Sequence, residues 1–519
     1  MSNLLDKASI VTTPTAYENG KILSVKPTDG IGDFDFTRNS SATRVNSQGL
    51  IEDMQILSSN LVTNGDFSNG STGWILGASW SIGNNKATRL TSVDWGLDQT
   101  ISSAVNGRTY RVTTEITDYT SGELRLALGS GGTVNVIGNA LGVYVNEFVW
   151  TGSSGSIIRF QGNFVGSITN ISVIEITDDT NLPRIDYTDG VGSWLFEPQS
   201  TNLIITSDSG VYGSSPASEI LTTAPDGTNT SVRPVPSTGS NRYTGQISGG
   251  AYATNTKITY SWYRKRISTP VIDTYVGDLQ PNILVNVTQV GSTTQIESDI
   301  SGFDRFSSTF NITDGSLDSN IRLYFGAIVG TGNSSVAYWG HQLEVGSYAT
   351  SYIPTNGSTV TRLQDAASGA GSSDLINSTE GVLYAEIAAL ADDLSFRVLS
   401  LNDGTNNNTV KFGYRSDSNK IYSEFRAASS SQSFMSFDVS DITEFNKVAF
   451  KYKENDFALW VNGVKRATDT SGAVPNIGTF NSLSFNRGDV NNIFFGKTKC
   501  VAVFKEALTD AELTCLTTI

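Results

Sequence analysis

The chain has 519 residues and a formal net charge of −15, from 35 basic and 50 acidic side chains. It contains no basic run that could neutralise phosphates, which argues against a nucleic-acid surface and against an anionic membrane surface. Fifty Gly, 24 Phe and 19 Tyr stand beside few strong helix formers, and this composition predicts an all-β protein of several domains.

The N-terminal region, residues 1–56, contains the polar string DFDFTRNSSATRVNSQGLIE. It does not open with a basic segment followed by an apolar run, so we expect no secretory signal peptide. No apolar stretch approaches about eighteen residues, so we expect no membrane insertion. The apolar residues near the N-terminus have too little sequence around them to form a hydrophobic core of their own. We therefore expect them to pack at a subunit interface; they are Leu4, Leu5, Ile10 and Val11.

A repeat follows this region. SNLVTNGDFSNGSTGW begins at Ser59 and TNLIITSDSGVYGSSP begins at Thr201, and each leads from Asn-Leu through a Gly/Ser/Asn turn into short strands. Such units predict two antiparallel β-sandwiches, over residues 57–180 and 201–350. In each sandwich one strand has a clear apolar face by its period of two. These faces are Tyr110, Val112 and Thr114 in the first sandwich, and Ile258, Tyr260 and Trp262 in the second.

Two connectors, residues 181–200 and 351–376, flank the second sandwich. The first contains breakers, yet Trp194, Leu195 and Phe196 need burial, so we expect it to dock on its neighbours and not to hang free. The second overlaps the string SYATSYIPTNGSTVTRLQD, Ser347 to Asp365, which repeats the Ser/Thr-rich character of the N-terminal polar string.

The third sandwich spans residues 377–519. Val448, Phe450 and Tyr452 alternate with polar residues, a turn follows, and the next strand places Phe457, Leu459 and Val461 on one face. EALTDAELTCL near the end is the convincing helical segment, because Thr509 can cap it and Glu512 follows three residues later. A sandwich closed by a short C-terminal helix is therefore predicted.

These strings also carry a resemblance. NGDFSNGSTGW resembles carbohydrate-binding jelly-roll modules, and FKYKENDFALWVNG with VAVFKEALTDAEL is similar to concanavalin-like, laminin-G-like lectin domains. FDFTRNSSATRVNSQGLIE, PRIDYTDGVGSWLFEPQSTNLI and QLEVGSYATSYIPTNGSTVTR together resemble virion fibre and spike proteins of tailed phages, of the head-fibre type. The resemblance implies two jelly rolls, a concanavalin-like sandwich, and an N-terminal anchor that attaches to the capsid or to other virion proteins.

Glycan binding requires aromatic platforms with polar neighbours, since sugar C–H faces pack on rings and hydroxyls pair with amides and carboxylates. The alternative is that these rings fill cores or subunit interfaces. Trp460 falls on the strand face opposite Phe457, Leu459 and Val461, so it is a candidate for a solvent-facing ring. The candidates are Trp74, Trp80, Trp95, Asp94 and Asp98 in the first sandwich and Trp460 in the third.

No catalytic set emerges, so we expect no enzyme. His341, the one histidine, lies inside a strand, where an ordinary structural role is expected. We expect no cofactor, although a jelly roll can hold a structural calcium through acidic oxygens, with Asp66 as the residue to watch. Cys500 and Cys515 are expected to be reduced, with a disulfide as the alternative.

The function predicted from these observations and the resemblance is that of a structural virion protein of a tailed phage. It would be a homotrimeric head fibre that projects lectin-like domains toward host-surface or environmental glycans. The alternatives are a tail fibre or receptor-binding protein, and a free carbohydrate-binding module with no virion role.

Overall fold

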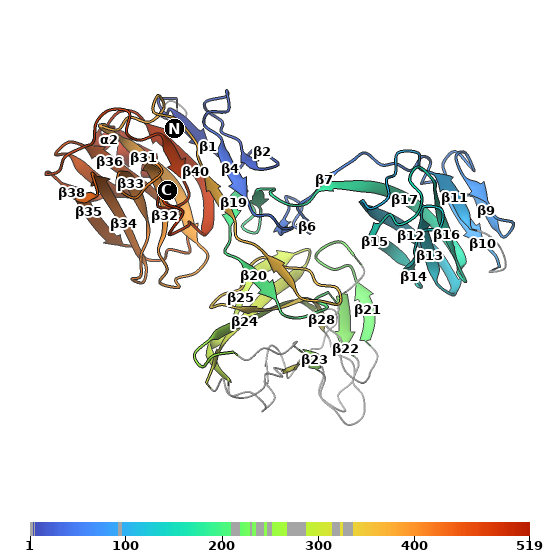
Figure 1. Cartoon of the computed structure of the whole chain (residues 1–519). Coiled ribbons are helices and arrows are strands. Elements are labelled where there is room, and N and C mark those ends of the chain that lie inside the picture. The colour runs from blue at the N-terminus through green and yellow to red at the C-terminus, as the bar shows by residue number, and fades with distance from the viewer. Residues whose placement is uncertain are drawn as a thin grey trace. The chain divides into compact units, whose positions relative to one another are not determined.

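Figure 1 shows the chain as a computed structural model, which describes residues 4, 6–91, 96–208, 218–228, 231–234, 243–246, 252–266, 287–313, 322–324 and 336–519. The chain forms two compact units, one of residues 55–179 with 219–232, and one of residues 1–54, 180–218 and 233–519. The regular structure is almost entirely antiparallel β, as predicted. Among the described residues, no helix is long and apolar enough to cross a bilayer.

The first sandwich has two antiparallel sheets, ordered β15-β12-β17-β10-β9 and β14-β13-β16-β11-β8, with β7 also paired to β17. The pairs are nested along the chain and alternate between the sheets: β13 with β14, β12 with β15, β11 with β16, and β10 with β17. This is jelly-roll connectivity, as expected. The strands are β7 Ile56–Leu57, β8 Ile75–Leu76, β9 Trp80–Gly83, β10 Lys86–Arg89, β11 Leu97–Thr100, β12 Thr109–Ser121, β13 Leu124–Leu128, β14 Val134–Gly138, β15 Gly142–Val149, β16 Ile157–Gly162 and β17 Val165–Asp178.

The second sandwich is described in part. Its main sheet contains the antiparallel order β28-β24-β26-β25, and β23 pairs with β27. The predicted face of Ile258, Tyr260 and Trp262 lies in its hydrophobic core. Much of the remainder of the predicted jelly roll lies outside the described residues. The strands are β21 Ser218–Thr222, β22 Ser231–Pro234, β23 Tyr243–Gln246, β24 Lys257–Arg266, β25 Val287–Ile300, β26 Phe303–Ile312, β27 Arg322–Tyr324 and β28 Val336–Val345.

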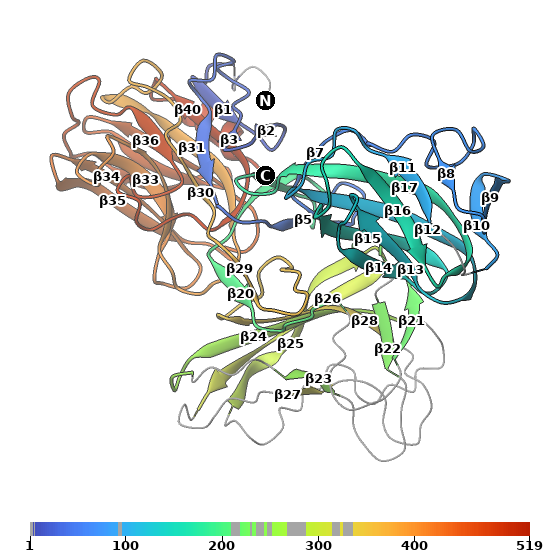
Figure 2. The same ribbon diagram turned by 45° about the vertical axis from the view of Figure 1, so that its right-hand side comes forward.

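The C-terminal sandwich packs one sheet, ordered β18-β19-β40-β31-β36-β37-β38, on a second, ordered β35-β34-β33-β32-β39. Figure 2 shows β33, β34 and β35 in one layer and β31, β36 and β40 in the other. The strands are β18 Arg184–Asp186, β19 Ser193–Phe196, β31 Glu380–Ala389, β32 Arg397–Asn402, β33 Thr409–Tyr414, β34 Lys420–Ala427, β35 Ser430–Asp438, β36 Asn446–Lys453, β37 Phe457–Val461, β38 Val464–Asp469, β39 Ser482–Ser484 and β40 Gly496–Phe504.

The predicted hairpin and helix of this sandwich are both present. Val448, Phe450, Tyr452, Phe457, Leu459 and Val461 all lie in the main core. Asn462 and Gly463 turn the chain with φ of 51° and 78°, the left-handed pair that a two-residue hairpin requires. The terminal helix α2, Asp510–Thr517, begins with the reciprocal capping box of Thr509 and Glu512.

The N-terminal segment belongs to this same unit. Strand β1, Ile10–Thr12, pairs with β40, so that Ile10 lies opposite Val503. Ile10 and Val11 are buried in the chain's own cores, and Leu4 packs against one of them. The expectation that Ile10 and Val11 pack at a subunit interface is therefore wrong, because β40 supplies the partner that local sequence lacks. Leu5 lies outside the described residues.

The connectors also fold as strands, and Trp194, Leu195 and Phe196 are buried as expected. Strand β19 of the first connector pairs with β40, and β30 of the second pairs with β4 of the N-terminal segment. The short strands in these segments are β2 Tyr17–Glu18, β3 Lys21–Ile22, β4 Phe34–Thr37, β5 Thr43–Val45, β6 Ile51–Asp53, β20 Ser200–Asn202, β29 Val360–Arg362 and β30 Ala366–Ser368.

A buried cluster of charges forms where the N-terminal polar string meets the two connectors. It contains one arginine from each segment, Arg38, Arg184 and Arg362, together with Glu197 and Asp365. We name these five residues the arginine cluster. Arg38 donates to Asp365 at 3.1 Å, and Arg184 pairs with both Asp365 and Glu197, the latter at 2.6 Å. Arg362 lies 2.8 Å from Glu197. All five side chains are almost wholly buried. The strings are therefore the places where three distant segments of the chain are tied together.

The charges of the cluster perturb one another. Burial alone would raise the pKa of Glu197, but Arg362 and Arg184 outweigh it and hold that pKa at about 2. Burial lowers the pKa of Arg38 to about 10, despite the attraction of Asp365. Three buried guanidinium groups share only two carboxylates, so both carboxylates are needed to compensate the buried positive charge.

Candidate functional site

The three described candidate residues of the first sandwich, Trp74, Trp80 and Asp98, do not form a surface platform. Trp74 and Trp80 lie in the hydrophobic core, and the Trp74 indole N–H donates to the Asn64 carbonyl oxygen at 2.9 Å. Asp98 is buried in a bidentate ion pair with Arg159, at 2.9 and 2.7 Å. Trp74 and Trp80 therefore fill the core, which was the alternative to glycan binding. Trp95 and Asp94 lie outside the described residues.

Asp66 lies exposed in the Asn-Gly-Asp-Phe turn. Its Oδ1 accepts hydrogen bonds from the Ser68 backbone N–H at 3.2 Å and the Ser68 hydroxyl at 2.9 Å, and these bonds lower its pKa. Among the residues that the structure describes, no group of three or more His, Cys, Asp or Glu side chains is placed to hold a metal ion. The calcium site at Asp66 stays a prediction.

Trp460 is the clearest correction. Its ring does point away from the main core, as the alternation predicted, but it is only 4% exposed. The reason is that α2 lies over this face, and its Leu513 and Leu516 form a second core with Trp460. The expectation that Trp460 faces solvent is therefore wrong, and the ring is unavailable to a ligand.

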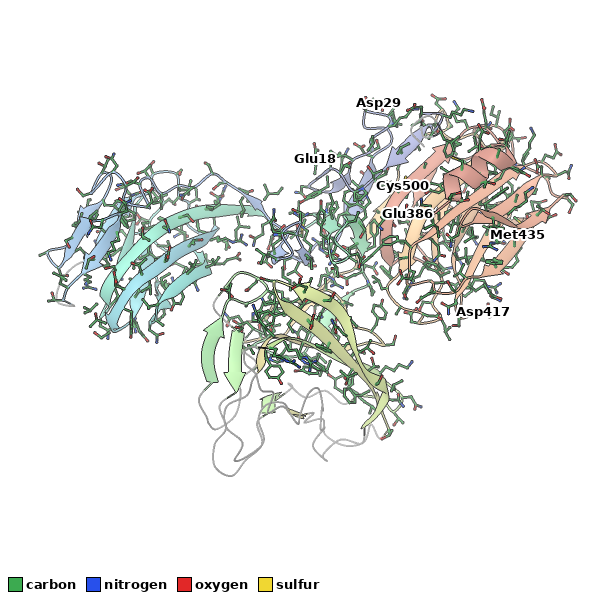
Figure 3. The ribbon with its side chains drawn as sticks, turned by 180° about the vertical axis from the view of Figure 1, so that it is seen from behind. Glu18, Asp29, Glu386, Asp417, Met435 and Cys500 are labelled. Carbon is green, nitrogen blue, oxygen red and sulfur yellow. The ribbon has the colours of Figure 1, made fainter. Side chains whose placement is uncertain are left out.

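The single histidine and the cysteines have structural surroundings. His341 is fully buried, its Nδ1 lies 2.7 Å from the Tyr260 hydroxyl, and burial lowers its pKa to about 3. Both cysteines are free thiols. Burial, aided by Glu386, raises the pKa of Cys500 to about 12 (both residues are labelled in Figure 3), and Cys515 is exposed.

A different set of residues forms an aromatic group on the C-terminal sandwich, with two exposed rings, Phe396 and Phe434. In β34, Ile421 and Phe425 face the core, so Tyr422 and Glu424 between them point to the opposite side. Tyr422 is only 4% exposed there, so it supports its neighbouring rings and offers little surface of its own. In β35, Met435 faces the core and its neighbour Phe434 faces outward, 48% exposed (Met435 is labelled in Figure 3).

The rings on this outer side are mutually packed. Tyr422 and Phe434 stack with centroids 5.9 Å apart, and Phe396, which is 42% exposed, meets Tyr422 edge-on at 6.2 Å. The Arg415 guanidinium carbon lies 5.0 Å from the Phe434 ring centre, and Arg415 lies 3.6 Å from Asp417. We name Phe396, Tyr422, Phe434, Arg415 and Glu424 the aromatic face.

Charged groups border these rings. Lys411 on β33 lies opposite Glu424 in the register, and their side chains form an ion pair of 2.9 Å. Arg426 lies 3.1 Å from the same carboxylate. Burial would raise the pKa of Glu424, but Lys411 outweighs it and the pKa is lowered, so Glu424 is held ionised. The face thus combines exposed ring surface with a fixed carboxylate and two cations.

This combination can hold a ligand that has both an apolar face and hydroxyl groups. Two exposed rings offer flat apolar surface, and Glu424 and Arg426 offer hydrogen-bond acceptors and donors at its border. The sequence reasoning missed the face, although its signal was present. In a strand of period two, KIYSEFRA places Ile421 and Phe425 on one face and Tyr422 on the other, and Phe434 lies opposite its neighbour Met435, but no tryptophan marks either strand.

Comparisons with known proteins cover part of the chain. Residues 383–514 match the family model of the concanavalin A-like lectin/glucanases superfamily. The search of the curated proteins finds no match for the sequence.

Three solved structures illustrate the structural likeness. The CBM40 of the Ruminococcus gnavus IT-sialidase, bound to α2,3-sialyllactose, is 18% identical, with 27% of this chain and 83% of that chain covered and a TM-score of 0.23. Domain 4 of AbnA, a GH43 extracellular arabinanase from Geobacillus stearothermophilus, in complex with arabinotriose, is 13% identical, over 33% of this chain and 82% of that chain, with a TM-score of 0.24. The leech intramolecular trans-sialidase is 20% identical, over 27% of this chain and 24% of that chain, with a TM-score of 0.24.

TM-scores this low say nothing about the ligand of this chain. The family match rests on sequence, and it falls on the residues that build both sheets of the C-terminal sandwich and α2. Residues 383–514 therefore form a concanavalin-like β-sandwich.

Proposed function

We propose that this protein is an adhesive, glycan-binding protein whose C-terminal sandwich holds saccharides on the aromatic face. The observation that carries the proposal is the pair of exposed rings, Phe396 and Phe434, beside the ionised Glu424. Sugar C–H faces pack on such rings while hydroxyls pair with the charged border. The match of residues 383–514 to a lectin and glucanase superfamily supports this reading.

The proposed action is binding without catalysis. The only histidine of the chain is fully buried beside Tyr260, which supports a structural role for it. A single open face gives weak binding, so adhesion would come from several copies that engage one surface together. Linked copies raise the effective concentration, and avidity can exceed the single-site affinity by factors of about 10² to 10⁴.

Replacing Phe434 with alanine is expected to weaken glycan binding by about tenfold or more, since a stacking ring contributes on the order of 1.4 kcal/mol. The measurement is a glycan array followed by titration with the glycan that binds best. The matched control is Tyr119→Ala, which removes an exposed ring (38%) from the first sandwich. An equal loss of glycan affinity in both variants, or no loss in Phe434→Ala, would reject the aromatic face as the glycan-binding site.

We also propose that the protein is a structural virion protein of a tailed phage, a homotrimeric head fibre. The three connector strings support this through their resemblance to fibre and spike proteins. Attachment is proposed through the N-terminal region, where Val25 and Ile31 are apolar and exposed. A tail fibre or receptor-binding protein, and a free carbohydrate-binding module, are the alternatives.

Gold labelling of purified particles with an antibody against the C-terminal sandwich tests this placement. Label around the capsid in electron micrographs is the expected result. Label at the tail would replace the head fibre with a receptor-binding device of the tail. Particles without any label would remove the virion role and leave the free module.

A further inference from the structure

A pocket of about 670 Å³ lies within the larger compact unit, a size typical of small-molecule sites. Its walls come from the outer side of the second sandwich's sheet, from both connectors and the N-terminal segment, and from strand ends of the C-terminal sandwich. It is distinct from the aromatic face, none of whose five residues lines it.

The floor of the pocket is rich in hydroxyl groups. On β26, Phe306 and Phe310 face the core of the second sandwich, so Ser307 and Thr309 turn the other way. The register places Thr294 of β25 opposite Ser307. Serine and threonine hydroxyls can both donate and accept, so this floor can match ligand hydroxyls of either polarity. The floor hydroxyls are those of Ser292, Thr294, Ser307 and Thr309.

Most of the charges in the walls are already compensated inside the protein. Glu197 belongs to the arginine cluster, and Asp186 accepts hydrogen bonds from the backbone N–H groups of Val45 and Thr188 at 3.0 and 3.1 Å. A charged ligand would have to break such pairs, so the walls favour an uncharged one. The remaining wall pairs are Arg44–Glu52 at 2.7 Å, Arg305–Glu297 at 2.8 Å and Lys497–Asp189 at 2.7 Å.

Aromatic rings complete the walls. Tyr348 and Phe445 are both partly exposed, and the Lys499 ammonium lies 3.8 Å from the Phe445 ring centre. Tyr263 is fixed at the base, because its hydroxyl donates to Glu297 at 2.9 Å. Rings, hydroxyls and self-paired charges in one open pocket suit a molecule with apolar faces and many hydroxyls.

We propose that this pocket is a second binding site, for a neutral saccharide. The inference goes beyond the proposed function, because it needs neither the aromatic face nor a place on a virion. A neutral sugar can displace water from the Ser/Thr floor and pack against Tyr348 and Phe445 without disturbing the ion pairs.

The test compares full-length variants on an array of neutral and sialylated oligosaccharides. Thr294→Trp fills the pocket from an exposed position on β25, and Gln295→Trp, on the adjacent exposed residue outside the lining, is the matched control. We expect Thr294→Trp to lose a set of neutral glycans by tenfold or more, while Gln295→Trp and Phe434→Ala keep them. Phe445→Ala should weaken the same set without adding bulk.

The other outcomes overturn the inference in recognisable ways. If Phe434→Ala loses all binding and Thr294→Trp loses none, the pocket is not a sugar site and the proposed function stands. If only sialylated glycans depend on Thr294, the ligand class is wrong. If the unaltered protein binds no glycan, both proposals fail. Thermal unfolding of each variant shows whether any loss is a loss of folding.

Discussion

Replacing Asp365 with alanine will lower the free energy of unfolding of the larger unit by about 3 to 5 kcal/mol, the cost of breaking a buried ion pair. The Asp365 carboxylate is fully buried, pairs with Arg38 and Arg184, and accepts the Glu197 backbone N–H at 2.8 Å. Without it, three buried guanidinium groups share the single carboxylate of Glu197. Denaturant unfolding of the full chain, followed by fluorescence, measures the loss.

The control for this experiment is Glu18→Ala, an exposed carboxylate of the same N-terminal segment, labelled in Figure 3. Its removal should change stability by no more than about 0.5 kcal/mol. If Asp365→Ala is as mild as this control, the buried cluster does not hold the segments together.

Low pH is expected to destabilise the fold through the same arginine cluster. The folded-state pKa of Glu197, about 2, lies below its ordinary value of 4.5. Ionised Glu197 therefore stabilises the fold fully above about pH 4.5, and this contribution is lost as the pH falls toward 2. A Glu197→Gln variant, less stable at neutral pH, should show a shallower fall in thermal midpoint between pH 5 and 2 than the unaltered protein.

The second large effect is expected from Trp460→Ala. The ring is buried against Leu513 and Leu516 of α2, so its removal leaves a cavity beneath the helix. Truncating a buried tryptophan costs about 3 to 5 kcal/mol. Ile477→Ala, which truncates a side chain that is 82% exposed, is the control and should be nearly neutral. A loss below about 1 kcal/mol in Trp460→Ala would mean that the helix does not cover this face.

For Trp460, the sequence predicted the strand face of the ring but not its burial. Alternation correctly separated Trp460 from Phe457 and Leu459, because that depends only on the period of the strand. Whether the second face meets water depends on α2, about fifty residues later, and nothing in the strand itself reports that contact. The capping box was predictable for the opposite reason, since Thr509 and Glu512 are near neighbours.

The arginine cluster could not be predicted from the sequence. An arginine in a Ser/Thr-rich string is ordinarily exposed, and Asp365, the shared partner, lies 327 residues from Arg38 and 181 from Arg184. The aromatic face could have been predicted from the period of two, which separates Tyr422 and Phe434 from their core-facing neighbours Ile421 and Met435. It was missed because tryptophans were weighted over phenylalanines, and most of the tryptophans chosen are core residues.

The pairing of β1 with β40 constrains the order of events on the ribosome. Val503 is synthesised roughly 490 residues after Ile10. At a synthesis rate of about 5 to 20 residues per second, this is a delay of some 25 to 100 seconds. The strands of the first sandwich lie between residues 56 and 178, so they can close during that interval. Strand β1 is thus among the last to find its place, because its pairing with β40 can form only after the residues between them have been made.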